Sequence, residues 1–127
     1  MTGKVISFEN GEERYRKIAE EYAERGDFSG ALGFLFTAKN TAVSLEVLMD
    51  IADCYADMGL LELSNHYWFK YLDRAPKEKQ GVAFEELAIN FFYMDDYLAS
   101  SYYFHQKLTV DGFITKENLD KDILDFF

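Results

Sequence analysis

The sequence has little of several residue types that mark particular classes of protein. Cys54 is its only cysteine, so no disulfide can form within the chain, which fits a reducing compartment. Pro76 is its only proline, and long stretches without proline favour helices. No apolar run is long enough to span a bilayer, and residues 1–8 lack the apolar stretch of a signal peptide. These features predict a soluble, cytoplasmic and largely helical protein.

Positive charge is also scarce. The chain has 13 lysine and arginine residues against 23 aspartate and glutamate residues, which gives a net charge of −10. Nucleic-acid binding needs cations that neutralise phosphates, and binding to an anionic membrane surface needs them too. The charge balance therefore argues against both, and it would steer a basic partner toward the protein surface.

The sequence is rich in apolar and aromatic residues. Hydrophobic residues make up 49% of the 127 residues, and there are 12 phenylalanines and 9 tyrosines. A disordered chain is poor in such residues, whereas this content is enough for the core of one domain. We therefore expect a single domain over residues 1–127.

An internal repeat organises most of the chain. Gly26 and Gly59 lie 33 residues apart in similar segments, and this offset aligns further residues without gaps. The aligned pairs are Tyr15 with Leu48, Ile18 with Ile51, Ala19 with Ala52, Tyr22 with Tyr55, Phe28 with Leu61, Ala31 with Ser64 and Leu35 with Trp68. A third copy follows at an offset of 36 and contributes Phe84, Leu87, Ala88, Phe91, Tyr97, Ser100 and Phe104.

Each copy has the pattern of two helices. Apolar residues recur at helical spacing on one face, and the small residues Ala19, Ala52 and Ala88 would let a neighbouring helix approach closely. Gly26 and Gly59 can adopt the left-handed conformation that ends a helix. The pattern predicts helices near 11–25, 28–40, 43–58, 60–74, 78–94, 96–108 and 116–126. The apolar stripe of the last helix would consist of Leu119, Ile123 and Phe126 or Phe127.

This register resembles the tetratricopeptide repeat (TPR) family. The similarity rests on three features of the repeat. The first helix of each copy carries a large, an apolar, a small and an aromatic residue in that order, and a Gly–acidic–aromatic turn follows at 26–28 in the first copy. The second helix then carries a small residue followed by a large apolar or aromatic one. The similarity covers residues 12 to 108. The departures are Asp95 in place of the turn glycine, Tyr71 and Lys107 in place of small residues, and Val43 in place of proline.

The resemblance implies an all-α fold, a right-handed α-solenoid of antiparallel helix pairs with about seven helices. The repeats would span about 12–44, 45–80 and 81–112, and a capping helix would follow at about 115–127. Proteins of this family are usually scaffolds, and the first helix of each pair lines their concave face.

The resemblance places twelve residues in a concave groove that would hold a peptide or protein partner. They are Glu13, Arg16, Glu20, Glu24, Glu46, Met49, Asp53, Asp57, Glu85, Ile89, Phe92 and Tyr93. Seven of them are acidic and only Arg16 is basic, so the groove would be acidic over two repeats and apolar over the third. This predicts a basic ligand with an apolar anchor. The alternative is an acidic face that is only solvated and holds no ligand.

Some TPR domains grip the C-terminal carboxylate of heat-shock chaperones with lysine, asparagine and arginine. The matching positions here are Arg16, Glu20, Asp50, Val82 and Glu86. Only Arg16 is one of the residue types that the clamp uses, and the acidic residues would repel the anionic end of a peptide. We therefore expect no carboxylate clamp.

Residues that could carry catalysis or bind a metal have simpler explanations. His66 and His105 lie at non-equivalent positions of the repeat, with no second ligand at metal-binding spacing. Asp53 and Asp57 resemble paired carboxylates, but no nucleophile accompanies them. Cys54 is better explained as a small, semi-buried residue. We expect no enzymatic activity, no cofactor and no metal.

The sequence therefore predicts a scaffold or adaptor that binds a protein or peptide, without nucleic acid or membrane. Two alternatives stay open. The chain could be a structural module that self-associates through its C-terminal end, or it could be the helical regulatory part of a larger protein. Both are motivated by Phe126 and Phe127, because two aromatic residues at a chain end are unusual unless they are covered.

Overall fold

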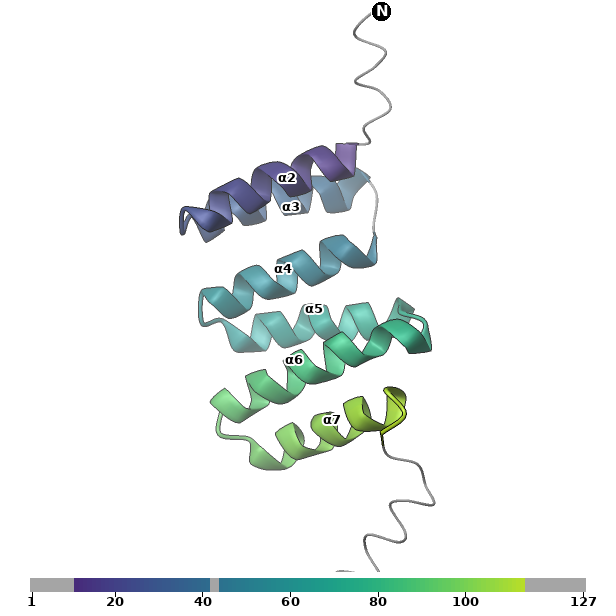
Figure 1. Ribbon diagram of the computed structural model, residues 1–127. Helices are drawn as coiled ribbons and strands as arrows, with labels where there is room; N and C mark the ends of the chain where they lie inside the picture. The colour runs from purple at the N-terminus through teal and green to yellow at the C-terminus, as the bar shows by residue number, and fades with distance from the viewer. Residues whose placement is uncertain (1–10, 42–43, 114–127) are drawn as a thin grey trace, which may run out of the picture. The chain divides into compact units, whose positions relative to one another are not determined.

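The computed structural model describes residues 11–41 and 44–113, which form helices joined by short turns (Figure 1). The helices are α2 (Gly11–Glu24), α3 (Phe28–Thr41), α4 (Leu45–Asp57), α5 (Leu61–Arg74), α6 (Gln80–Tyr93) and α7 (Tyr97–Val110), with a 3₁₀ turn, η1 (Lys77–Lys79), before α6. These described ranges contain no strand, and six of the predicted helices are confirmed in them. The predicted helix at 116–126, with Leu119, Ile123, Phe126 and Phe127, lies outside the described residues.

The described chain forms two compact units that divide within α5, after Tyr71. In the N-terminal unit, α2 packs against α3, and α4 packs against both of them. In the C-terminal unit, α6 packs against α7, and η1 contacts α6. Helices that are neighbours in the sequence therefore pack as pairs, as the repeat predicted.

Small residues occupy buried positions on all four helices of the N-terminal unit. Ala19 on α2 and Ala52 on α4, which the repeat aligns, are both buried, and Ala52 is 0% exposed. Ala31 and Ser64, which align on the second helices, are also completely buried. Because such side chains barely separate two backbones, they set the spacing between helices. The core around them is filled by larger residues: Leu35, Val47, Leu48, Ile51, Tyr67, Trp68 and Tyr71.

The same use of small residues recurs between α6 and α7. Ala88 on α6 is buried, and the hydroxyl of Ser100 on α7 donates a hydrogen bond to the Ala88 carbonyl oxygen at 2.7 Å. The ring of Tyr103 stacks on Phe91, with centroids 5.4 Å apart, and on Phe84, at 6.4 Å. A small residue at position 100 lets α7 come close enough to α6 for both ring contacts.

The turns that end α2, α4 and α6 share one backbone geometry. Each contains a residue with positive φ: Gly26 (80°), Gly59 (77°) and Asp95 (63°). In each turn the next residue donates its amide to a carbonyl five residues back: Asp27 to Tyr22, Leu60 to Tyr55, and Asp96 to Phe91, all at 2.9 Å. This Schellman arrangement satisfies the last carbonyls of a helix. Asp95 therefore adopts the conformation of the turn glycine that the third copy lacks.

Asp95 is expected to be the strained member of these three turns. A non-glycine residue at positive φ costs roughly 1 kcal/mol, because its Cβ crowds the following carbonyl oxygen. We expect Asp95→Gly to raise the melting temperature and Gly59→Ala to lower it, both measured by thermal unfolding followed by circular dichroism. A lower melting temperature for Asp95→Gly would mean that the hydrogen bond from the Tyr97 hydroxyl to the Asp95 carboxylate, 3.1 Å long, outweighs the strain.

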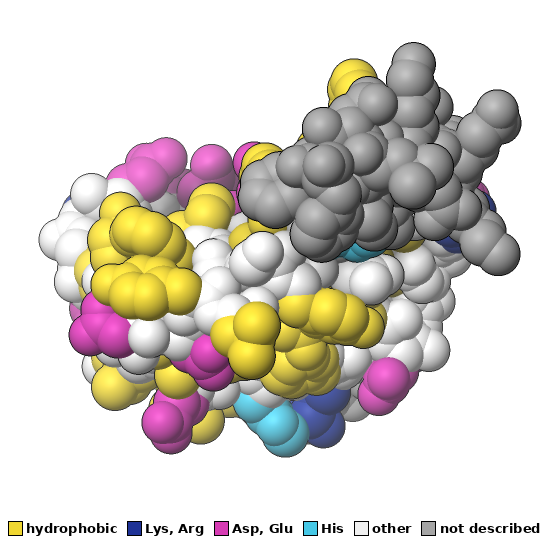
Figure 2. All heavy atoms as spheres, turned by 90° about the horizontal axis from the view of Figure 1, so that it is seen from below, with side chains coloured by type: hydrophobic (Ala, Val, Ile, Leu, Met, Phe, Trp, Pro, Cys, Tyr) yellow, Lys and Arg dark blue, Asp and Glu magenta, His cyan; other side chains and the backbone are white. Residues whose placement is uncertain are grey.

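α7 carries an exposed apolar surface. None of its residues is buried, and Leu98 is 85% exposed. Tyr102, Phe104 and, just beyond the helix, Phe113 are also more than half exposed. Figure 2, which is seen from the side of α7, shows apolar side chains gathered on this face. Phe104 thus differs from Trp68, its buried counterpart in the second repeat.

Candidate functional site

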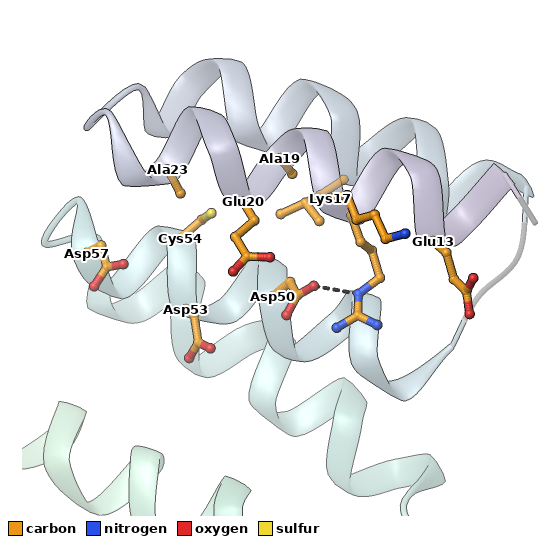
Figure 3. A pocket seen from close by; sticks show the side chains of 11 residues that line it. Glu13, Lys17, Ala19, Glu20, Ala23, Asp50, Asp53, Cys54 and Asp57 are labelled. Carbon is orange, nitrogen blue, oxygen red and sulfur yellow. Dashed lines mark hydrogen bonds and ion pairs between the residues drawn. The ribbon is translucent and has the colours of Figure 1, made fainter. Parts of the chain in front are cut away.

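A pocket of about 550 Å³ lies between α2 and α4 in the N-terminal unit (Figure 3). Its lining residues are Glu13, Arg16, Lys17, Ala19, Glu20 and Ala23 from α2, Leu35 from α3, and Asp50, Asp53, Cys54 and Asp57 from α4. On each helix these residues recur every three or four positions, so they lie on one face. α2 and α4 therefore each present one face to the pocket, and two of the pairs that the repeat aligns, Lys17 with Asp50 and Glu20 with Asp53, line it together.

The pocket combines an apolar floor with a charged opening. Ala19, Leu35 and Cys54 are buried, whereas Glu20 and Asp53 are exposed. Five carboxylates and two cations line the pocket, which gives the lining a net charge of −3. Figure 3 shows the Glu20 side chain extending from α2 toward α4. Such a site suits a group that carries positive charge at the end of an apolar stem.

Arg16 is paired inside this pocket. Its Nε donates a hydrogen bond to Oδ2 of Asp50 at 2.7 Å, and the two side chains are 31% and 28% exposed. The hydrogen bond raises the pKa of Arg16 above its ordinary value, although burial acts in the opposite direction. Because one carboxylate of the protein already holds this guanidinium, it is poorly placed to receive the carboxylate of a ligand. The pair also links α2 to α4, which at this exposure stabilises the fold by at most about 1 kcal/mol.

Cys54 lies at the floor of the pocket, and its thiol is expected to be poorly reactive. Burial is the main cause that raises the pKa of the thiol to about 11, and the negative charges of Asp57, Asp50 and Asp53 contribute to the same rise. The thiolate is the reactive form of cysteine, so little of the side chain is reactive near neutral pH. Cys54 is therefore better suited to packing than to nucleophilic chemistry.

Cys54 is expected to resist alkylation while the protein is folded. With a thiol pKa of about 11, against an ordinary value near 9, iodoacetamide at pH 8 should label it about 100-fold more slowly than an ordinary thiol. The rate should rise steadily as the pH approaches 11, and urea unfolding should restore the ordinary rate at pH 8. Intact-protein mass spectrometry measures both. Labelling of the native protein as fast as the unfolded one would show that the pocket floor is not buried.

The pocket brings together five of the twelve residues predicted to line a groove: Glu13, Arg16, Glu20, Asp53 and Asp57. Glu24, Glu46 and Met49 lie on the same two helices but do not line the pocket. Six further lining residues were not among the twelve: Lys17, Ala19, Ala23, Leu35, Asp50 and Cys54. Asp50 and Cys54 precede Asp53 and Asp57 by three residues, so helical spacing contained the signal that would have found them.

The other four predicted groove residues lie on α6, in the C-terminal unit. Glu85, Ile89, Phe92 and Tyr93 are all exposed. The ring of Phe92 contacts Tyr93, with centroids 5.7 Å apart, and Tyr97, at 5.4 Å. We call these three rings the α6 aromatic cluster. Each ring-bearing residue is more than half exposed, and exposed apolar clusters of this kind are typical of binding surfaces.

Comparison of the sequence with models of known protein families found no match, and a search of curated protein sequences found no relative. Within the two described ranges, no group of three or more His, Cys, Asp or Glu side chains is placed to hold a metal ion. None of the described helices is both long and apolar enough to cross a membrane. The functional inference therefore depends on the repeat register and on the geometry of the pocket.

Proposed function

We propose that this chain is a TPR-type scaffold that binds a basic segment of a protein partner in the pocket between α2 and α4. The observation that carries the proposal is the pocket itself, whose acidic opening lies above an apolar floor on the first helices of two repeats. A lysine or arginine side chain matches this chemistry. Its apolar stem would contact Ala23 and Leu35, and its cationic head would reach Glu20 or Asp57.

Charge and apolar contact have separate roles in this proposal. The net charge of −10 speeds the encounter with a basic partner and favours it over acidic competitors. Each exposed ion pair contributes only about 0–1 kcal/mol, so apolar contacts must supply much of the affinity. The repeat register predicts that Ile89, Phe92 and Tyr93 hold an apolar anchor of the partner, and we propose the α6 aromatic cluster, which contains two of them, for this role.

A panel of short synthetic peptides tests the proposed function. The peptides would match in length and in aromatic content but would be basic, neutral or acidic, and fluorescence anisotropy would measure their binding to the full chain. Basic peptides should bind best, and their affinity should fall as salt rises to about 1 M, where the Debye length is about 3 Å. Equal binding of basic and acidic peptides, or binding that salt does not change, would contradict the proposal.

The apolar anchor leads to a separate prediction about single substitutions. Phe92→Ala should weaken binding of the best basic peptide by about 2 kcal/mol, because it removes a large aromatic contact. Glu24→Ala removes one exposed charge outside the pocket and should cost about 0–1 kcal/mol. Both residues are exposed, so neither change should unfold the domain, which circular dichroism can verify. If the two variants bind equally well, the α6 aromatic cluster is not the anchor site.

A further inference from the structure

The pocket between α2 and α4 already holds one guanidinium, that of Arg16, and its contact indicates which kind of cation the pocket suits. Arg16 extends from α2 toward α4, and its Nε donates a hydrogen bond to Oδ2 of Asp50 at 2.7 Å (Figure 3). Each of the two side chains is less than one third exposed. A guanidinium therefore fits between these helices and is held there by a carboxylate of the facing helix.

Beyond Arg16, carboxylates lie on both walls of the pocket. Glu20 follows Arg16 by about one turn of α2, and Asp57 follows Asp50 by about two turns of α4. Figure 3 shows Glu20 extending toward α4, and Asp57 at the end of the pocket away from Glu13. Neither Glu20 nor Asp57 forms a hydrogen bond or an ion pair with another residue in the described ranges. One carboxylate on each helix is thus available to a cation from outside the chain.

Guanidinium and ammonium groups would use this arrangement differently. A guanidinium has five N–H donors fixed in one plane, so it can bind two carboxylates on different edges at the same time. An ammonium is a compact and strongly hydrated charge, and it loses more hydration when it enters a partly buried site. The buried floor of Ala19, Leu35 and Cys54 offers apolar contact, which suits the weakly hydrated guanidinium better.

We propose that the partner residue that enters this pocket is an arginine, whose guanidinium bridges Glu20 on α2 and Asp57 on α4. This inference rests on the proposed function, since it takes a basic segment as the ligand and names the residue type that the pocket selects. Arg16 occupies the region beside Asp50 and confines the ligand to the other end of the pocket. Asp50 neutralises Arg16, which limits the repulsion between the two guanidinium groups.

Three synthetic peptides test this assignment with the full chain. They share their length and aromatic content and carry arginine, lysine or citrulline, an uncharged isostere of arginine, at every basic position. Fluorescence anisotropy measures their affinities. We expect the arginine peptide to bind about tenfold more tightly than the lysine peptide, because its planar donors reach carboxylates on both walls. The lysine peptide should bind more tightly than the citrulline peptide, because it keeps the positive charge.

Removing the charge of one wall carboxylate tests the bridge itself. Glu20→Gln should reduce the preference for arginine over lysine from about tenfold to about threefold or less, because the guanidinium then keeps a single carboxylate. The matched control is Glu21→Gln, which makes the same change on α2 at a residue that does not line the pocket. It should leave the preference for arginine at about tenfold. Both glutamates are exposed, so both variants should fold, which circular dichroism can verify.

Two results would overturn this inference and leave the proposed function in place. One is equal binding of the arginine and lysine peptides, with both tighter than the citrulline peptide. The other is a preference for arginine that Glu20→Gln does not reduce, which would place the guanidinium elsewhere on the protein. A citrulline peptide that binds as tightly as the two charged peptides would contradict the proposed function itself, and the inference would be rejected with it.

Discussion

Ala52→Leu is expected to destabilise the protein by about 1–3 kcal/mol or more, whereas Ala23→Leu should cost much less. Ala52 is 0% exposed and lies on α4 at the position that the repeat aligns with Ala19. Added methylene groups at Ala52 must push α4 away from its neighbours, because the close-packed core has no space for them. Ala23 is half-buried on the wall of the open pocket, where a larger side chain can extend toward solvent.

Urea unfolding followed by circular dichroism measures this difference directly. The two substitutions add the same atoms to helical positions, so helix propensity contributes equally to both and cancels in the comparison. Equal losses of stability for Ala52→Leu and Ala23→Leu would mean that the core and pocket faces of α2 and α4 have been assigned wrongly.

Much of the fold could be predicted from the sequence because the repeat shows every important position more than once. A single alanine indicates little, but Ala19, Ala52 and Ala88 at equivalent positions indicate close helix contact, and all three are buried. Asp95 marks the limit of this reasoning. In the sequence, Asp95 replaces the glycine found in the turns of the first two copies. The backbone nevertheless forms the same turn at Asp95, with a φ of 63°. Aspartate is one of the few non-glycine residues that adopt the left-handed conformation, so the loss of glycine did not exclude this turn.

The site was harder to predict than the fold. Helical spacing placed Glu20, Asp53 and Asp57 on one face, and they do line one pocket. The pairing of Arg16 with Asp50 was not predicted, because it depends on how α2 sits against α4 and on which of several acids the guanidinium reaches. Leu35 was assigned to the core, and the sequence does not show that a pocket reaches down to it.

Reversing two charges at the pocket should have the largest effect on function. Asp53→Lys together with Asp57→Lys changes the lining from a net charge of −3 to +1, since each substitution adds two units of charge. We expect the affinity for the best basic peptide to fall by about 10- to 100-fold, or about 1.4–2.8 kcal/mol. Two favourable charge contacts are lost, and two cations then repel the ligand. Fluorescence anisotropy with the same peptide measures the loss.

The control for this experiment is Glu21→Lys together with Glu62→Lys. Both glutamates are exposed and neither lines the pocket, so the net charge of the protein changes by the same amount at a different place. Loss of binding only in the pocket variant assigns the effect to the site. Equal loss in both variants would mean that overall charge attracts the peptide and that the pocket has no special part in binding.

The central claim is that the shared face of α2 and α4 receives the basic partner, and mapping amide chemical shifts tests it most directly. A ¹⁵N-labelled full chain would be titrated with the best basic peptide, and the perturbed amides would be assigned along the sequence. The proposed function predicts the largest changes around Glu20 and Ala23 on α2 and around Asp53 and Asp57 on α4. Changes confined to α7, or to the exposed residues of α3, with the amides of α2 and α4 unmoved, would contradict it.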